Sequence, residues 1–257
     1  MYINRVLNVA AHAGKIILES GAETYRVEET MVKICTSFEI KNADSFVTPT
    51  GIMLSVTSLD GEIVSVIKRI QNRTVSLEKI SKVNNLSRSI KNNGLSIDEV
   101  EYELIKIETS KGYSNAALIF CSAIGAGFFT LIFGGTFSDF CISLLIGILI
   151  KCASIKLAYK SINDFFSNII GGSIAALTAL IFYKLGIVVN VDKVIIGSIM
   201  LLVPGLAITN AVRDTIAGDL LSGVTRGLEA FLTAVGIAVG TGIIFKIWIA
   251  FFGGIHI

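Results

Sequence analysis

Apolar segments dominate the second half of this 257-residue chain, and they limit its possible folds more than any other feature. A helix needs about 20 residues to cross the hydrocarbon core of a bilayer. Most of the segments reach that length, and the fourth is marginal. We therefore expect residues 112–257 to form an all-α polytopic membrane bundle of about five transmembrane helices. Their expected bounds are 115–133, 137–158, 165–185, 194–209 and 228–252.

Charged residues are concentrated in the first half of the chain. Residues 1–111 hold 14 of the 22 Lys and Arg residues and 14 of the 20 Asp and Glu residues. Neither half carries the basic stripe that is typical of nucleic-acid-binding proteins, so we expect no nucleic-acid partner. The contrast predicts a domain over residues 1–111 that lies outside the bilayer.

Within residues 1–111 the pattern predicts an α+β domain. Apolar residues recur at helical spacing, and two S-x-x-E capping boxes, Ser20 with Glu23 and Ser96 with Glu99, mark helix starts. Alternating apolar and polar residues on both sides of an Asp-Gly dipeptide indicate a β-hairpin. The expected order is a helix pair over 4–19 and 20–38, a hairpin within 46–67, and helices over 76–90 and 96–111.

Basic residues in the expected loops indicate how the bundle is oriented, because cytoplasmic loops carry an excess of Lys and Arg. An odd number of spans places the two chain ends on opposite sides. We expect a cytoplasmic N-terminus and a C-terminus outside. Loops on the side of the first domain hold Lys151, Lys156, Lys160, Arg213 and Arg226, against Lys184 and Lys193 on the other side.

The sequence predicts neither a metal site nor a cofactor site. Its four cysteines are scattered, without a C-x-x-C pair or a His/Cys spacing that would hold zinc. Within apolar segments a free thiol packs as a small hydrophobic group. The cysteines are Cys35, Cys121, Cys141 and Cys152.

A helix breaker and a group of charges lie between the fourth and fifth apolar segments. Pro204 lacks a backbone donor and Gly205 tolerates unusual dihedral angles, so the fourth span should be kinked or broken there. Broken helices hold ions and polar substrates in transporters, whereas an ordinary proline kink is the alternative. Charged groups at a membrane usually face a cavity, a partner or a substrate. We expect a substrate or proton pathway lined by Pro204, Gly205, Asn210, Arg213, Asp214, Asp219, Arg226 and Glu229.

If residues 211–226 form one helix, Asp219 and Arg226 share its polar face. Arg213 then falls on the apolar side, which is a poor position for a charge that faces lipid. We expect Arg213 to point into the protein, against Asp214, another acid or an anionic ligand. The alternative is an amphipathic helix on the cytoplasmic surface, with the Arg213 side chain snorkelling.

Two separated motifs carry a family resemblance that extends over nearly the whole chain. One comprises Gly14, Ser20-Gly21-Ala22-Glu23-Thr24, Arg26 and Glu28-Glu29. The other comprises Pro204-Gly205, Asn210, Arg213-Asp214, Gly218-Asp219, Ser222-Gly223, Arg226-Gly227 and Glu229-Ala230. Together they resemble the signatures of the threonine/serine exporter (ThrE-like) family, in its YjjP-like half.

The resemblance implies a cytoplasmic N-terminal domain, five transmembrane helices, and export of small polar organic acids across the bacterial inner membrane. Threonine and serine are the family's named substrates, and split relatives are associated with dicarboxylates such as succinate. Fused members carry a second five-helix unit on the same chain, whereas this sequence ends at Ile257 after one unit. The expected partner is a separate, smaller YjjB-like membrane subunit, with self-association of this chain as the alternative.

The charged residues can be given chemical roles in such an exporter. Arg213 or Arg226 could hold a carboxylate through two hydrogen bonds. Asp214, Asp219 or Glu229 could hold an ammonium group or carry a proton that is exchanged for the substrate.

The N-terminal group Glu23, Thr24, Arg26 and Glu28 could form a cytoplasmic gate or docking point. Two other functions remain open. With His12 and Glu29, these residues could act in an enzyme that the bundle anchors to the membrane, and the alternative for them is a solvated helix face with i,i+3 ion pairs. The chain could also be a regulatory subunit without its own pore. His256 has no expected role.

Overall fold

The computed structural model describes residues 2–58 and 61–253. The chain divides into two compact units. The first unit joins Met1–Lys111 to Leu206–Gly227, and the second joins Gly112–Gly205 to Leu228–Ile257. The expected boundary at residues 111/112 placed 206–227 with the membrane helices, whereas in the structure this segment packs with the N-terminal residues.

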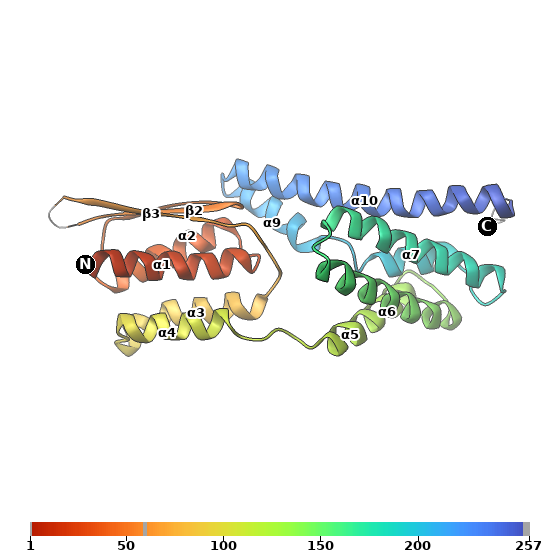
Figure 1. The fold of residues 1–257 in the computed structure, drawn as a ribbon, viewed down its shortest axis with the longest axis horizontal. Helices are drawn as coiled ribbons and strands as arrows, with labels where there is room; N and C mark the ends of the chain where they lie inside the picture. The colour runs from red at the N-terminus through yellow and green to blue at the C-terminus, as the bar shows by residue number, and fades with distance from the viewer. Residues whose placement is uncertain (1, 59–60, 254–257) are drawn as a thin grey trace. The chain divides into compact units, whose positions relative to one another are not determined.

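The first unit is built in three layers (Figure 1). A middle layer of α1 (Tyr2–Glu19) and α2 (Thr24–Ser37) lies between a sheet and the helix pair α3 (Leu77–Asn93) and α4 (Ile97–Glu108). Because α1 has neighbours on both sides, its apolar residues are buried around most of its circumference. The aliphatic core of this unit therefore centres on α1.

The sheet has three antiparallel strands in the order β1 (Ala43–Thr48), β2 (Gly51–Thr57) and β3 (Ile63–Arg69). The predicted hairpin is confirmed as β2 and β3, and β1 adds a third strand that the sequence pattern did not separate. Alternate β2 residues Ile52, Leu54 and Val56 are buried. The sheet covers the middle layer with this apolar face.

Helix termini confirm one capping box and contradict the other. Ser96 and Glu99 make both reciprocal hydrogen bonds at the start of α4, and Gly94 closes α3 in the left-handed conformation. At α2, however, Glu23 is itself the N-cap residue and makes no side-chain cap bond. The Ser20 hydroxyl instead donates to the Ile16 carbonyl, 2.6 Å away, within the last turn of α1. The predicted Ser20–Glu23 capping box does not form, because Gly21 (φ 91°) inserts a turn between the two helices.

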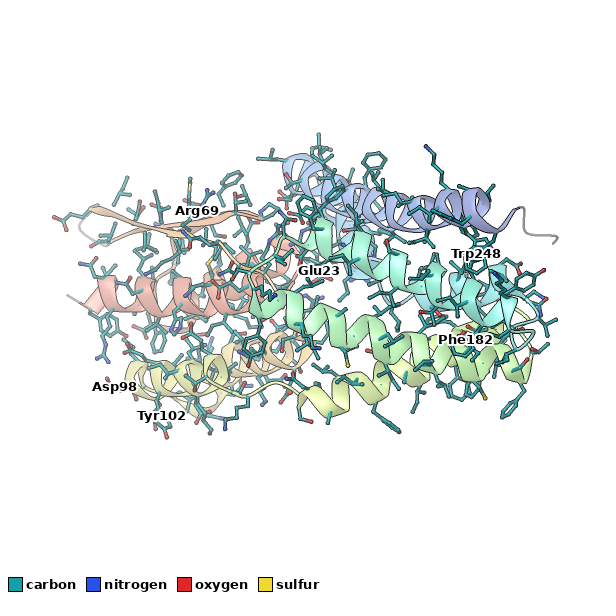
Figure 2. All side chains as sticks on the ribbon, turned by 45° about the vertical axis from the view of Figure 1, so that its right-hand side comes forward. Glu23, Arg69, Asp98, Tyr102, Phe182 and Trp248 are labelled. Atoms are coloured by element: carbon teal, nitrogen blue, oxygen red, sulfur yellow. The ribbon has the colours of Figure 1, made fainter. Side chains whose placement is uncertain are left out.

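The second unit contains α5 (Asn115–Ile132), α6 (Phe137–Tyr159), α7 (Asp164–Lys184), α8 (Val191–Ile199) and most of α10 (Leu220–Phe252). Four helices of the described chain, α5, α6, α7 and α10, are long and apolar enough to cross a membrane. Phe182 and Trp248 belong to the apolar packing of this unit (Figure 2). The structure is therefore α+β in its first unit and helical in its second.

The fourth predicted span is broken rather than continuous. The 9-residue helix α8 ends at Ile199, and α9 (Gly205–Ile216) starts directly after Pro204. The break lies where the missing proline donor predicted it. The expected helix over 211–226 is also interrupted, because Gly218 takes φ 95° between α9 and α10.

Glycines allow close helix contacts in the second unit. A Cβ atom at Gly240 of α10 would lie 2.1 Å from the Ile169 carbonyl oxygen of α7, and one at Gly172 would lie 2.6 Å from the Ile237 carbonyl oxygen. These approaches leave no room for a side chain. Small residues at these positions therefore let the helices pack closely inside the second unit.

Candidate functional site

The turn between α1 and α2 meets the segment 206–227 in a buried polar cluster of the first unit. Gly21 closes α1 tightly, with the Ala22 amide donating to the Ile17 carbonyl at 3.0 Å. This turn leaves the carbonyl groups of Gly21 and Ala22 without helical donors. Asn210 donates to Gly21 O at 2.9 Å, and Arg226 donates to Ala22 O at 2.6 Å. We call the set Glu23, Thr24, Asn210, Arg213, Asp214, Asp219 and Arg226 the gate cluster.

Asp214 lies at the centre of the gate cluster. Its exposed fraction is 0%, and one carboxylate oxygen is 3.0 Å from Nε of Arg226, whose side chain is 6% exposed. Burial raises the pKa of Asp214 above its ordinary value, although Arg226 and hydrogen bonds from Thr24 oppose that rise. Asp214 therefore holds a proton more readily than an exposed aspartate does.

Thr24 connects two carboxyl groups. Its Oγ1 atom lies 3.0 Å from Oδ1 of Asp214 and 2.9 Å from Oδ2 of Asp219. A hydroxyl has one hydrogen to donate and lone pairs to accept. If both carboxyl groups are ionised, one contact sets two lone pairs against each other. When one carboxyl group is protonated, it donates to Thr24, and Thr24 donates to the other. The geometry is therefore complete with one proton on the pair.

Glu23 carries the ion pairs at the edge of the cluster. Its carboxylate contacts Nη1 of Arg213 at 2.5 Å and Nε of Arg26 at 2.9 Å. Burial favours the neutral acid, but the Glu23 backbone N–H and the two guanidinium groups outweigh it, so the pKa of Glu23 is lowered. The Arg213 side chain is 55% exposed, whereas that of Glu23 is 10% exposed. Arg213 thus forms an ion pair with an acid other than Asp214, which was one of the three expected partners. Part of its side chain remains accessible.

Glu28 is a further carboxylate near the cluster. It accepts a hydrogen bond from the Val47 amide of β1 at 2.9 Å. Burial raises the pKa of Glu28, and the negative charges of Asp219 and Asp214 raise it further. The electrostatic influence is mutual, so the protonation of Glu28 and that of Asp214 are coupled.

The apolar side of segment 206–227 is exposed. Large side chains at 54–81% exposure alternate with the buried polar ones along α9 and the start of α10. They are Val212, Ile216, Leu220, Leu221 and Val224. The segment is therefore amphipathic, as its alternative interpretation expected, although Gly218 divides it.

The remaining predicted residues are not members of the gate cluster. Pro204 precedes α9 and Gly205 is its first residue. Glu229 is in the second unit, on α10. His12 bonds Glu108 of α4 at 2.9 Å, and within residues 2–58 and 61–253 it forms no hydrogen bond or ion pair with Glu23 or Glu28. Those same residues contain no group of three or more His, Cys, Asp or Glu side chains that could hold a metal ion.

Sequence reasoning missed a second buried carboxylate, in the second unit. Asp139 has an exposed fraction of 0% and accepts hydrogen bonds from the amides of Thr136, Val189 and Asn190. It ties the start of α6 to the loop before α8. The Thr136-x-x-Asp139 pattern is a capping-box signal that could have identified its local role.

Comparison with protein-family models matches residues 8–248 to a family described as "Putative threonine/serine exporter". Over 250 residues the chain is 25% identical to the "Threonine/serine exporter" of Corynebacterium glutamicum, covering 93% of this chain and 50% of that protein. Over 246 residues it is 21% identical to a "Probable threonine/serine exporter" of Mycobacterium tuberculosis, covering 93% and 46%. The chain thus spans about half the length of these two relatives.

A shorter relative matches over most of its length. The "Probable succinate transporter subunit YjjP" of Klebsiella aerogenes is 20% identical over 233 residues, which cover 90% of each chain. No solved structure matches the chain. The family model covers both motifs on which the resemblance rested, and it confirms that resemblance. This chain belongs to the threonine/serine exporter family.

Proposed function

We propose that the chain is the membrane subunit of a proton-coupled exporter of small polar organic acids, either threonine and serine or a dicarboxylate such as succinate. The observation that carries the coupling is the Thr24 hydroxyl held between Asp214 and Asp219. Membership of the family supports the transport function. The named substrates of the three relatives, threonine/serine and succinate, support the substrate class.

The proton step follows from the pair of carboxyl groups. With one proton on the pair, the Asp214 carboxyl, the Thr24 hydroxyl and the Asp219 carboxyl form one continuous hydrogen-bonded chain. Loss of that proton leaves two carboxylates, Glu28 nearby, and Arg226 as the ion partner of Asp214. The deprotonated cluster is therefore less stable, and we expect segment 206–227 to separate from the α1–α2 turn in that state. Alternation between the two arrangements couples proton movement to gate opening, so that export proceeds in exchange for protons.

Arg213 is the better candidate for the substrate carboxylate. Arg226 is enclosed, donates to the Ala22 carbonyl and forms an ion pair with Asp214. Arg213 is more than half exposed and uses Nη1 for Glu23, so a substrate carboxylate can compete with Glu23 for this guanidinium. Displacement of Glu23 by the substrate would release the edge of the gate.

The membership of segment 206–227 in the first unit supports five crossings. If residues 1–111 and 206–227 lie on one side, the chain between them crosses the bilayer an even number of times. Helices α5, α6 and α7 supply three crossings, so α8 and the residues up to Pro204 supply the fourth. The 9-residue α8 rises about 14 Å and the residues after it turn rather than extend, so this fourth crossing is a short, broken span.

The fifth crossing, by α10, places the C-terminus outside the bacterial cytoplasmic membrane when the first unit is inside. The exposed apolar side chains of segment 206–227 favour contact with the inner surface of the bilayer. Because the chain spans half of the two exporters, we propose that a second, smaller five-helix subunit completes the transporter. A homo-oligomer is the alternative assembly.

The test is export from bacterial cells that express the chain with and without a candidate five-helix partner. Labelled threonine, serine and succinate are followed at several external pH values. In the Thr24→Val variant the hydroxyl is lost at nearly constant volume. A hydrogen bond to a charged group contributes about 1.5–3 kcal/mol, so we expect the pH midpoint of export to fall by about one unit or more. Thr24→Ser keeps the hydroxyl and should retain the midpoint.

Matched carboxyl variants complete the design. Asp214→Asn and Asp219→Asn should each remove proton dependence, whereas Asp192→Asn, at an exposed position of α8, should not. Coupled export that persists in both Asp214→Asn and Asp219→Asn overturns the proton role. Export of none of the three compounds in either setting favours an anchored enzyme or a regulatory subunit instead.

A further inference from the structure

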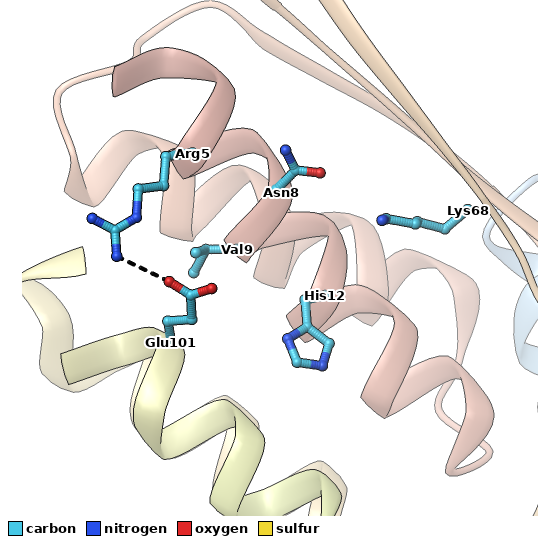
Figure 3. Close-up of a pocket in the computed structure, with 6 residues that line it drawn as sticks. All are labelled: Arg5, Asn8, Val9, His12, Lys68 and Glu101. Carbon is cyan, nitrogen blue, oxygen red and sulfur yellow. Dashed lines mark hydrogen bonds and ion pairs between the residues drawn. The ribbon is translucent and has the colours of Figure 1, made fainter. Parts of the chain in front are cut away.

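A polar cavity of about 360 Å³ opens in the first unit, apart from the gate cluster. Its lining comes from α1 (Arg5, Asn8, Val9 and His12), β3 (Lys68) and α4 (Glu101), as Figure 3 shows. None of these residues belongs to the gate cluster. The volume falls within the range that is usual for small-molecule sites.

The spacing of the α1 residues explains how the cavity forms. Positions 5, 8, 9 and 12 share one face of a helix, because position 5 lies three and four residues before positions 8 and 9, and position 12 lies four and three residues after them. Val9 is 3% exposed and gives the cavity an apolar surface. The polar side chains stand around it, so a ligand here would find one apolar contact and several polar ones.

The charges of the cavity are separated. Nη2 of Arg5 bonds both Asp98 and Glu101, the latter at 3.0 Å through Oε2, so two acids already neutralise this guanidinium. Within the described part of the chain, Oε1 of Glu101 makes no hydrogen bond. The Lys68 side chain forms no hydrogen bond or ion pair with any residue in 2–58 or 61–253, and it extends toward Asn8 and His12 in Figure 3. One end thus offers a free cation and the other a carboxylate oxygen.

Asn8 and His12 add oriented polar groups between those ends. The Asn8 amide nitrogen donates to the Asn4 carbonyl at 2.8 Å, which fixes the amide and leaves its oxygen as an acceptor. Nε2 of His12 contacts Glu108 at 2.9 Å, which fixes the imidazole ring. Such prearranged groups bind a polar ligand with little loss of side-chain entropy.

We infer that this cavity binds a small zwitterionic α-amino acid, with the carboxylate on Lys68 and the ammonium group on Glu101 and the Asn8 oxygen. A ligand with both charges matches both ends. A dicarboxylate would set its second anion against Glu101, and like charges across a site oppose binding. If the chain exports amino acids, as proposed above, the cavity is a cytoplasmic sensing site for the amino acid that the transporter exports.

The test uses histidine as a reporter in the purified full chain, held in lipid nanodiscs. The sequence has two histidines, so selective imidazole labelling gives two resonances, and a His256→Gln variant identifies that of His12. L-threonine, L-serine and succinate are titrated separately. We expect threonine or serine to shift the His12 resonance in a saturable way and succinate to leave it unchanged.

Two variants and two matched controls test the assignment. Lys68→Gln and Glu101→Gln should each weaken amino-acid binding by about tenfold or more, since each removes a charge-assisted hydrogen bond. Lys91→Gln and Glu29→Gln change the same residue types at exposed positions outside the cavity and should bind as the wild type does. An Asp214→Asn variant, which should lose proton-coupled export, should still show the His12 shift.

The outcomes separate this inference from the proposed function. A His12 shift in a chain that exports nothing supports the cavity site and overturns the exporter. Export without a His12 shift overturns the cavity site alone. A shift caused by succinate, or one that survives Lys68→Gln and Glu101→Gln, also overturns it.

Discussion

Replacement of Arg226 by methionine should destabilise the first unit strongly, because it leaves Asp214 buried without its ion partner. Arg226 is 5% exposed and Asp214 is 0% exposed. Removal of one partner from a buried ion pair costs about 3–5 kcal/mol. Methionine fills a similar length of space without a charge, so the loss reports on the ion pair more than on packing.

The cost of protonating Asp214 gives a similar estimate of the stability that Arg226→Met loses. Without Arg226, Asp214 can avoid a buried charge by taking a proton. Keeping an aspartate of ordinary pKa, about 3.9, protonated at pH 7 costs about 4 kcal/mol. The Ala22 carbonyl also loses its donor, which adds about 1 kcal/mol. We expect the free energy of opening to fall by about 4–5 kcal/mol at pH 7.

The pH dependence has a defined sign. In Arg226→Met the folded pKa of Asp214 rises further above its unfolded value, so the folded form binds more protons. The stability penalty relative to the wild type is then largest at pH 7 and shrinks as the pH falls toward the wild-type pKa of Asp214. Its slope is about 1.4 kcal/mol per pH unit.

The assay is hydrogen exchange of α2 and α9 amides in the full chain in nanodiscs, compared with the wild type at pH 7 and pH 5.5. The double variant Arg226→Met/Asp214→Asn has no buried charge to leave unpaired and should recover at least half of the loss. A penalty below about 1 kcal/mol, a penalty that does not change with pH, or a double variant no better than the single one would refute the reasoning.

Two further predictions concern packing and proton affinity. Gly240→Ala should lower the thermal midpoint of the purified chain, since its Cβ atom would lie 2.1 Å from the Ile169 carbonyl oxygen and overpacking costs about 1–3 kcal/mol. Gly242→Ala, two residues along the same helix with no atom within 4 Å, should leave that midpoint unchanged, and equal effects would contradict the packing. Glu28→Gln keeps an acceptor for the Val47 amide but removes a negative charge that interacts with those of Asp214 and Asp219. The pH midpoint of export should therefore move downward, and an unchanged or higher midpoint would count against this electrostatic link.

Local signals predicted most of the fold. The Ser96 box, the αL residue Gly94 and the Pro204 break all lie where short-range backbone chemistry places them. The Ser20 box failed for an equally local reason, because Gly21 ends one helix before the next can use the serine. The single helix expected over 211–226 failed at Gly218, whose positive φ the apolar periodicity did not reveal.

The site was predictable only as a set of residue types. The charges near Asp214 stood out because they lie between apolar segments, and the Glu23–Thr24 motif stood out separately. Sequence spacing could not show that Thr24 contacts Asp214 across a separation of 190 residues. Nor could it distinguish enclosed Arg226 from accessible Arg213, since that difference depends on the carbonyl groups exposed by the Gly21 turn.

The first unit is assembled from two segments that are far apart in the chain, and this sets the order in which it can fold during synthesis. Thr24 emerges from the ribosome early, whereas Asp214, Asp219 and Arg226 are made only after α5 to α8. Until then the Gly21 and Ala22 carbonyls lack the donors that they have in the finished protein. Closing so long a loop is slow, and open intermediates tend to associate. A fragment limited to residues 1–111 would remain at that stage, and a chaperone has its longest opportunity to bind there.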